Sequence, residues 1–290
     1  MELHTYQDED YRGRLERVYY QVTDEDGCEY DKYANIYLPY GYSEEKEYNI
    51  FYLVHGGGGN ADSWLDCSKI KNALDVSFAK RGVEPFIVVF PEFYNEAAQR
   101  QRRQMNGVDR DWTCDRVHFF QKELRNELIP AVESKYSTYA KDITEEGLRN
   151  ARKHRCIGGF SMGGITTWFA LAENLDLFAE FMPISGDSWA VEPLGGGSAT
   201  VKTVDFLCEE IKKSGYTGKD YRIFAGTGSK DIAYPNLSPQ IEEMKSHTEF
   251  FTYSEDLTQG NLHYVVHEGA EHTYEQVYQH IYHFLPYLFN

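Results

Sequence analysis

The segment from residue 154 to residue 173 constrains the fold most, because an apolar strand there passes into a helix with almost no connector. Its junction reads Gly159-Phe160-Ser161-Met162-Gly163, a serine with a glycine two positions away on each side. So sharp a turn imposes a strained backbone conformation on the serine, and only small residues fit at the flanking positions. We therefore expect Ser161 at the edge of a sheet, with its hydroxyl raised into a cleft.

The rest of the chain alternates between apolar runs and segments with helical spacing. The expected strands are Arg17 to Thr23, Tyr33 to Leu38, Asn49 to Val54, Pro85 to Phe90, His154 to Gly159, Phe178 to Ile184, Tyr221 to Ala225 and Tyr264 to His267. The expected helices are Leu65 to Ala79, Val117 to Lys135, Met162 to Glu173 and about Tyr274 to Leu288. We expect the first two strands to pair antiparallel. The alternation predicts an α/β fold with a mainly parallel sheet, helices on both faces and ligands beyond the carboxyl ends of the strands.

Length and charge limit the function classes. We expect the 290 residues to form one domain with a sizeable core. The formal charge of −17, from 46 acidic and 29 basic side chains, opposes binding to nucleic acid or an anionic membrane, which favours a neutral substrate. No membrane span or signal-peptide pattern is visible. The five cysteines lack the close pairs of a zinc or redox site, so we expect no metal.

A second glycine cluster, His55-Gly56-Gly57-Gly58-Gly59-Asn60, directly follows an expected strand. It resembles the HGGG oxyanion loop, in which bare backbone approaches a substrate closely. The N–H of Gly57 would join that of Met162 in binding the negative oxygen of a tetrahedral intermediate. A phosphate-binding loop is the alternative, but the cluster lacks the lysine and following Ser or Thr of a P-loop and the spacing of a dinucleotide fingerprint.

A serine nucleophile needs a base and an acid, and the chain order in this architecture is serine, acid, histidine. Of the six histidines after Ser161, four lie in expected strands or in the last helix or beside them: His263, His267, His280 and His283. His272 lies in the turn between the last strand and the last helix, where an imidazole can reach the carboxyl edge of the sheet. Asp231 and Asp187 both follow strands, so both are candidates for the acid.

With these residues assembled, the chain resembles the feruloyl esterases of carbohydrate esterase family 1, which have the α/β-hydrolase fold, especially the modules attached to clostridial xylanases. The segments that carry the resemblance are HGGGGN at 55–60, VESKYSTYA at 132–140, GGFSMGGITTW at 158–168, FMPISGDSW at 181–189, GTGSKDIAYPN at 226–236, PQIEEMKS at 239–246 and GAEH at 269–272. Carried over position by position, the family's serine falls on Ser161, its acid on Asp231 and its histidine on His272.

The resemblance implies hydrolysis of the ester between ferulate, or a related hydroxycinnamate, and the arabinose side chains of xylan, without a metal or organic cofactor. It also implies secretion and, in the full protein, a link to a xylanase or another carbohydrate-active module. One departure follows the histidine, where related modules tend to carry tryptophans and this chain has Thr273 and Tyr274. The preference among ferulate, coumarate and sinapate therefore stays open.

Aromatic residues make up 15% of the chain, and one of them is a candidate substrate contact. Trp189 follows a strand end, so we expect it in a loop at the catalytic edge, where a planar acyl group can stack on it. Trp168 lies seven residues after Ser161, and we expect it to pack beneath the turn. Gly58 is the second expected substrate contact. The segment 92–115, with Arg100, Arg102, Arg103 and Trp112, either covers the cleft or presents solvated arginines.

Two rival functions remain open from sequence. Another esterase of the same architecture, such as an acetyl esterase, an S-formylglutathione hydrolase or an acyl transferase, would use the same three residues. A non-catalytic carbohydrate-binding relative would keep the fold alone, but the intact Ser161, Asp231, His272 and glycine loop argue against it.

Overall fold

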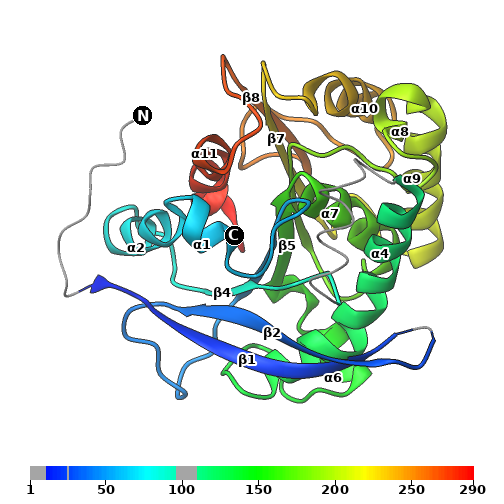
Figure 1. Ribbon diagram of the computed structural model, residues 1–290. Coiled ribbons are helices and arrows are strands. Elements are labelled where there is room, and N and C mark those ends of the chain that lie inside the picture. Colours follow the sequence, from blue (N-terminus) through cyan, green and yellow to red (C-terminus); the bar gives the residue numbers. More distant parts are fainter. Residues whose placement is uncertain (1–10, 25, 96–109) are drawn as a thin grey trace.

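A computed structural model describes residues 11–24, 26–95 and 110–290, apart from the side chains of 110–114. Within these ranges the strands form one eight-stranded sheet in the order β1-β2-β4-β3-β5-β6-β7-β8 (Figure 1). The strands are β1 (Arg14–Thr23), β2 (Glu29–Leu38), β3 (Ile50–Val54), β4 (Ile87–Phe90), β5 (Arg155–Phe160), β6 (Glu180–Ile184), β7 (Arg222–Gly228) and β8 (Leu262–His267).

Most strand pairs are parallel, as the alternation of strands and helices predicts. β1 pairs antiparallel with β2, and β2 pairs antiparallel with β4. The pairs from β4 through β3, β5, β6, β7 and β8 are parallel, so the carboxyl ends of these strands meet at one edge. The strand order and connections are those of the α/β-hydrolase fold.

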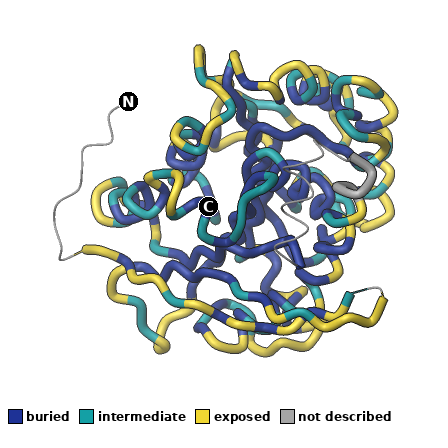
Figure 2. The backbone as a smooth tube through the Cα atoms, in the orientation of Figure 1, coloured by how far each residue is buried: buried dark blue, intermediate teal, exposed yellow. Residues whose placement is uncertain are grey.

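Position in the sheet explains the composition of the strands. β3, β5 and β6 are buried at every residue, because a central parallel strand has helices on both sides. β1 alternates between exposed and buried residues over its second half, as expected of an edge strand with one face in the core. Figure 2 shows this contrast, with a buried sheet centre and many exposed positions along β1.

Helices cover both faces of the sheet. On one face lie α1 (Ser63–Cys67), α2 (Ile70–Lys80), α11 (Tyr274–Phe284) and η4 (Leu285–Tyr287), whose apolar residues join one core cluster. The other cluster contains residues of α4 (Arg110–Glu123), η2 (Leu124–Leu128), α5 (Ile129–Glu133), α7 (Met162–Glu173), α9 (Thr200–Ser214) and α10 (Tyr234–Ser246). The shorter elements are α6 (Glu145–Asn150), η3 (Arg152–His154) and α8 (Gly195–Ser198). Among the described helices, none has the length and apolar character needed to cross a bilayer.

The structure confirms the eight expected strands and corrects one helix. The expected helix from Leu65 to Ala79 is two helices, because Ser68 is extended at φ −142° and ψ 175°. Its hydroxyl donates to the carbonyl of Trp64 at 2.5 Å and accepts from the N–H of Ile70 at 3.2 Å, so it replaces helical hydrogen bonds at the break. The expected helix from Val117 to Lys135 runs through α4, η2 and α5, with a π-helical turn in its middle.

Candidate active site

Ser161 lies in the tight turn between β5 and α7, at the carboxyl edge of the sheet. Its backbone has φ 56° and ψ −113°, a strained conformation for a residue with a side chain. A Cβ on Gly159 would lie 2.5 Å from the carbonyl oxygen of Val54, and one on Gly163 would collide with the same oxygen. The flanking glycines therefore let this turn pack directly on the end of β3, as the sequence predicts.

The turn also presents an unpaired backbone donor beside Ser161. Met162 is the first residue of the 12-residue helix α7, whose first backbone bond runs from the N–H of Ile165 to the carbonyl of Ser161. Within the described part of the chain, the N–H of Met162 has no hydrogen-bond acceptor. The positive end of the helix dipole strengthens the attraction between this N–H and a negative oxygen.

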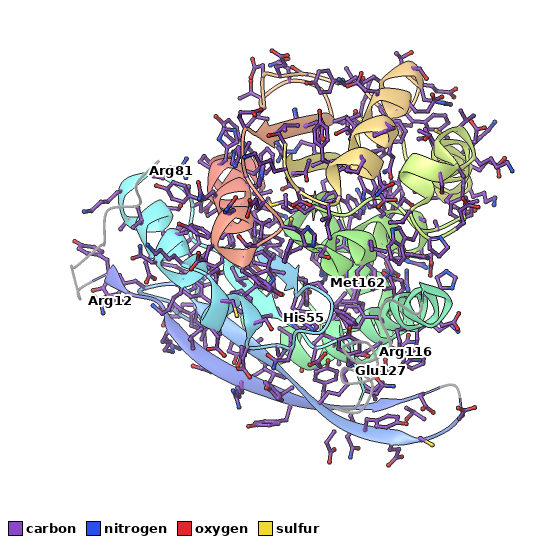
Figure 3. All side chains as sticks on the ribbon, turned by 45° about the horizontal axis from the view of Figure 1, so that its top comes forward. Arg12, His55, Arg81, Arg116, Glu127 and Met162 are labelled. Carbon is purple, nitrogen blue, oxygen red and sulfur yellow. The ribbon has the colours of Figure 1, made fainter. Side chains whose placement is uncertain are left out.

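The glycine loop faces this turn. A Cβ on Gly163 would lie 3.0 Å from the carbonyl oxygen of His55, and Figure 3 places His55 and Met162 in the same central region. A Cβ on Gly56 would lie 3.1 Å from the ring of Phe160. Val54, which leads into the loop, pairs with Gly159 in the sheet. The loop and the serine turn are therefore held together by two adjacent strands.

Hydrogen bonds within the protein occupy most of the N–H groups of this loop. Gly56 donates to the hydroxyl of Tyr274 at 2.7 Å, Gly58 donates to the hydroxyl of Tyr94 at 3.0 Å, and Gly59 donates to the carbonyl of Gly56 at 3.1 Å. Of the four glycine N–H groups, that of Gly57 has no acceptor among the described residues. Gly57 is thus the donor left for a ligand, and the expected substrate contact at Gly58 cannot use its N–H.

Asp231 and His272 meet at the same edge, 41 positions apart in the chain. Oδ1 of Asp231 lies 2.7 Å from Nδ1 of His272 and also accepts the N–H of Ala233 at 2.8 Å. The side chain of Asp231 is fully buried, whereas that of His272 is 20% exposed. Because Nδ1 donates to the carboxylate, the other ring nitrogen, Nε2, is left with its lone pair as a proton acceptor.

The alternative acid, Asp187, has different partners. Its Oδ1 accepts the indole N–H of Trp189 at 3.2 Å, and its Oδ2 accepts the N–H of Gly196 at 3.0 Å. These bonds hold the chain after β6 against α8. The geometry therefore favours Asp231 over Asp187 as the partner of a histidine.

Aromatic rings connect His272 to the serine turn. The ring of Phe160, the residue before Ser161, lies 4.5 Å from that of His272 and 4.9 Å from that of Tyr274, centroid to centroid. The last loop and the serine turn are therefore in direct contact. The structure thus gathers Ser161, Met162, Gly57, Asp231 and His272 at one edge of the sheet.

The two tryptophans singled out in the sequence differ less in burial than expected. Trp168 is fully buried and donates its indole N–H to the carbonyl of Gly186 at 2.9 Å, which fits a packing role. Trp189 lies in the loop after β6 as expected, but only 7% of it is exposed, so little of its ring is accessible for an acyl group to stack on. It still lines a small pocket of about 260 Å³ with Phe169, His118 and Pro193.

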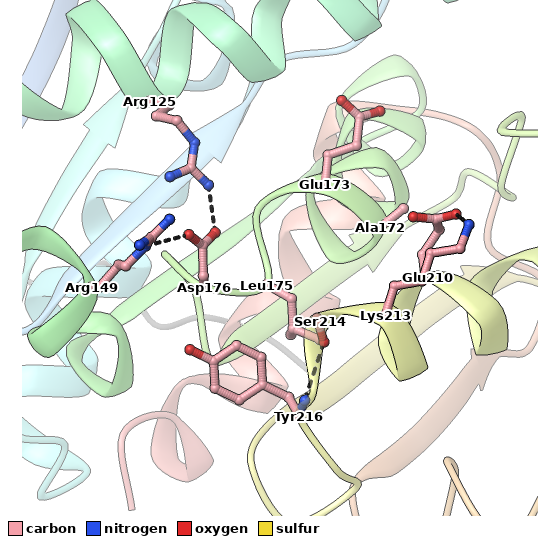
Figure 4. A pocket seen from close by; sticks show the side chains of 10 residues that line it. All are labelled: Arg125, Arg149, Ala172, Glu173, Leu175, Asp176, Glu210, Lys213, Ser214 and Tyr216. Carbon is pink, nitrogen blue, oxygen red and sulfur yellow. Dashed lines mark hydrogen bonds and ion pairs between the residues drawn. The ribbon is translucent and has the colours of Figure 1, made fainter. Parts of the chain in front are cut away.

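A second hollow, of about 520 Å³, lies at the far end of α7 from Ser161 (Figure 4). Arg125 and Arg149 both pair with Asp176, at 2.5 and 2.8 Å, and Lys213 pairs with Glu210 at 2.6 Å. Since these charges are matched within the hollow, we place the candidate chemistry at the other end of the helix.

Some expectations fall outside the described residues, and some contacts were not expected. The side chains of Arg100, Arg102, Arg103, Trp112 and Cys114 lie outside the described part of the chain. Tyr94 and Tyr274 accept N–H groups of the glycine loop, which no sequence motif predicts. The departure from the family resemblance at Thr273 and Tyr274 drew attention to Tyr274, but its partner Gly56 lies 218 positions away.

Comparisons with known proteins find similar esterase and xylanase sequences. Residues 28–284 match the family described as "Putative esterase". Endo-1,4-beta-xylanase Y from Acetivibrio thermocellus is 43% identical over 260 residues, which cover 89% of this chain and 22% of that protein. An endo-1,4-beta-xylanase/feruloyl esterase from Xylanibacter ruminicola is 26% identical over 207 residues, which cover 68% of this chain and 25% of that protein. The chain thus spans about a quarter or less of the length of these curated relatives.

A solved structure is similar over nearly the whole chain. It is a mutant of the feruloyl esterase module from Clostridium thermocellum complexed with sinapinate. The two are 40% identical with a TM-score of 0.80, and the match covers 96% of this chain and 89% of that one.

Proposed function

This chain belongs to the esterase family that its sequence matches, and from that premise we propose that it is a feruloyl esterase in which Ser161 is the nucleophile. The observation that carries the proposal is the 2.7 Å contact between His272 Nδ1 and Asp231 Oδ1, at the same edge as the strained Ser161. The choice of acyl group is supported by the similar module with bound sinapinate, a hydroxycinnamate.

In the first half of the reaction, Ser161 Oγ attacks the ester carbonyl and His272 Nε2 takes its proton. The carbonyl oxygen becomes negative and accepts hydrogen bonds from the N–H groups of Gly57 and Met162. Asp231 holds the ring of His272 in the tautomer that leaves Nε2 free, and it stabilises the imidazolium that forms. His272 then returns the proton to the departing sugar hydroxyl, which leaves the acyl group on Ser161.

In the second half, His272 takes a proton from water, and the resulting hydroxide attacks the acyl-serine. The same two N–H groups bind the second tetrahedral oxyanion. Collapse of that intermediate releases ferulate and returns the proton to Ser161. No step in this sequence requires a group outside the chain and water.

The substrate we infer is the ferulate ester of arabinose side chains on xylan, hydrolysed by residues 1–290 as one catalytic domain. Support comes from the two xylanase relatives, each much longer than this chain. By the same reasoning the full protein is secreted and carries a xylan-degrading module. The charge of −17 fits a neutral polysaccharide better than a polyanion.

Release of ferulate from wheat arabinoxylan, followed by chromatography, tests the proposal directly. The purified chain should release ferulate and should show a higher kcat/KM on methyl ferulate than on p-nitrophenyl acetate, because an aromatic acyl pocket discriminates through transition-state binding. Ser161→Ala is the matched control and should lower kcat by about 10⁴ to 10⁶. A higher kcat/KM on the acetate, with no ferulate release, would instead indicate an acetyl esterase.

A further inference from the structure

His55, the residue before the glycine loop, is buried and has hydrogen-bond partners at both ring nitrogens. Nδ1 lies 2.8 Å from the carbonyl oxygen of Gly56, and Nε2 lies 3.0 Å from Oε1 of Glu92. The imidazole stacks on Phe93, with ring centroids 4.3 Å apart and planes inclined by 14°. With 1% of the residue exposed, the ring is held in one orientation.

These partners determine where the protons of His55 lie. A carbonyl oxygen cannot donate, so Nδ1 carries a proton toward Gly56. On the other side, Oε1 of Glu92 already accepts the N–H of Tyr94 at 2.8 Å, and two donors on one oxygen favour the ionised carboxylate, with the shared proton on Nε2. Of the forms of histidine, only the imidazolium donates from both nitrogens.

The electrostatics of Glu92 agree with an ionised carboxylate. Burial raises the pKa of Glu92, but the charge and hydrogen bond of His55 and the N–H of Tyr94 outweigh burial, so this pKa lies below its ordinary value. Lys32, which itself pairs with Glu123 at 2.7 Å, lowers the pKa of Glu92 further. The buried side chain of Glu92 is therefore an ionised carboxylate that accepts hydrogen bonds from the ring of His55 and from the N–H of Tyr94.

The peptide between Gly56 and Gly57 links His55 to the cleft. The carbonyl of Gly56 and the N–H of Gly57 belong to one planar trans peptide group, so they point in opposite directions. The carbonyl oxygen is fixed by Nδ1 of His55 and by the N–H of Gly59 at 3.1 Å. The direction of the Gly57 N–H is fixed by the same contacts. A cationic donor on the carbonyl also polarises the amide, which strengthens its N–H as a donor.

We propose that His55 and Glu92 form an imidazolium–carboxylate pair that positions and polarises the Gly56–Gly57 peptide, so that its N–H binds the oxyanion. His55 is a positioning residue, since it acts through a backbone group and does not touch the reacting atoms. The inference rests on the proposed function, because it assigns the Gly57 N–H to an ester oxyanion.

Substitutions separate the charge of His55 from its hydrogen bond. Glu92→Gln keeps the side-chain length, and its amide can donate to a neutral imidazole, so the Nδ1 bond survives while the charge is lost. We expect kcat to fall about tenfold with KM little changed, because only the transition state carries the oxyanion. In that background, His55→Leu removes the donor as well and should lower kcat by about 10² to 10³ in total, the range for loss of one oxyanion donor. His55→Asn should restore part of that loss, since its amide can still donate to the Gly56 carbonyl.

A spectroscopic measurement tests the charge directly. In the ¹⁵N-histidine-labelled protein, both ring nitrogens of His55 should show the shifts of protonated nitrogens. The Nε2 signal should move to the neutral range in Glu92→Gln. His154→Asn is the matched control: His154 also bonds through Nδ1, at 2.7 Å to Asn49, and stacks on Tyr139, but it lies at the opposite end of β5 from Ser161.

A neutral His55 in the wild type, or equal kcat in wild type, Glu92→Gln and the double variants, would overturn the inference. A parallel fall in kcat and thermal stability that His154→Asn reproduces would also overturn it, because that pattern indicates a purely structural role. Because these kinetics are measured on p-nitrophenyl acetate, the test of His55 does not depend on whether ferulate esters are the substrate. A wild type that hydrolyses the acetate but releases no ferulate contradicts the proposed substrate and leaves the His55 inference standing.

Discussion

The phenol oxygen of Tyr274 accepts a 2.7 Å hydrogen bond from the backbone N–H of Gly56, which lies 218 positions earlier in the chain. Its ring also packs edge-on against Trp64, with centroids 5.0 Å apart, and against Phe160 at 4.9 Å. Tyr274 opens the last helix, two residues after His272. A single side chain therefore ties the glycine loop to the loop that carries the proposed base.

Tyr274→Phe should preserve this packing and remove the acceptor of the Gly56 N–H. An unsatisfied buried donor costs about 1 to 3 kcal/mol, so the thermal midpoint should fall. The loosened loop should also lower kcat on p-nitrophenyl acetate by roughly tenfold, because small displacements of catalytic donors are costly. Calorimetry and steady-state kinetics check both effects. Tyr278→Phe, one turn further along α11, is the control, and equal kcat losses in the two variants would contradict the proposed role of the hydroxyl.

The two candidate acids should respond differently to amidation. Asp231→Asn should lower kcat by about 10⁴ with little change in fold, because an amide no longer holds His272 in the productive tautomer. Asp187→Asn should mainly lower stability, since Asp187 accepts the N–H of Gly196 and the indole N–H of Trp189. Comparison of kcat at matched folded fractions decides between them. If Asp187→Asn loses more kcat than Asp231→Asn, the assignment of the acid is wrong.

The strands were predictable because their signal is local. β3 and β6 are short apolar runs with clear ends, and the serine turn fixes the junction of β5 and α7 within a few residues. The helices α9 and α10 were not predicted. The helix break at Ser68 was not predicted either, because it depends on the hydrogen-bond partners of one hydroxyl.

The candidate site was predictable to the extent that sequence motifs and chain order determine it. Ser161, Gly57 and Met162 lie in glycine-rich turns with fixed spacing, and His272 follows from its place between the last strand and the last helix. The choice between Asp231 and Asp187 depends on which carboxylate a distant histidine reaches. The partners of the glycine loop are Tyr94, after β4, and Tyr274, at the start of α11, so no local pattern indicates them.

Trp189→Ala should reduce activity on aromatic acyl esters more than on small ones. Part of the indole lines the pocket of about 260 Å³, so its loss should weaken transition-state binding of a hydroxycinnamoyl group by about 1 to 3 kcal/mol. Because most of the ring is buried, stability should also fall. The measurement is the ratio of kcat/KM on methyl ferulate to that on p-nitrophenyl acetate. Trp168→Ala, beneath the serine turn, should lower kcat/KM on both esters by a similar factor. An unchanged ratio for Trp189→Ala would show that the aromatic acyl group binds elsewhere.

A buried histidine cluster on α11 and β8 should make folding stability sensitive to acid. His280 is 1% exposed and stacks on His267, with ring centroids 3.7 Å apart. Burial, together with the neighbouring His267 and His283, holds the pKa of His280 well below its ordinary value. Burial also lowers the pKa values of His267 and His283. The native state therefore keeps these rings neutral at a pH where the unfolded chain binds protons.

The direction of this pH dependence follows from the protons that the folded and unfolded states bind. Above the ordinary histidine pKa of about 6.5, these rings are neutral in both the folded and the unfolded state, and the full stability is present. Below that pH the unfolded state binds protons first, so the free energy of unfolding falls as pH falls. Urea denaturation at about pH 7.5 and at about pH 5 should show this loss, and His280→Phe should reduce it by removing one titrating group. The pKa of His118 is shifted in the opposite direction, because its hydrogen bond to Glu173 raises it. His118→Gln should therefore leave the acid loss intact or increase it, whereas an acid loss of equal size in wild type and His280→Phe would show that carboxylates cause it.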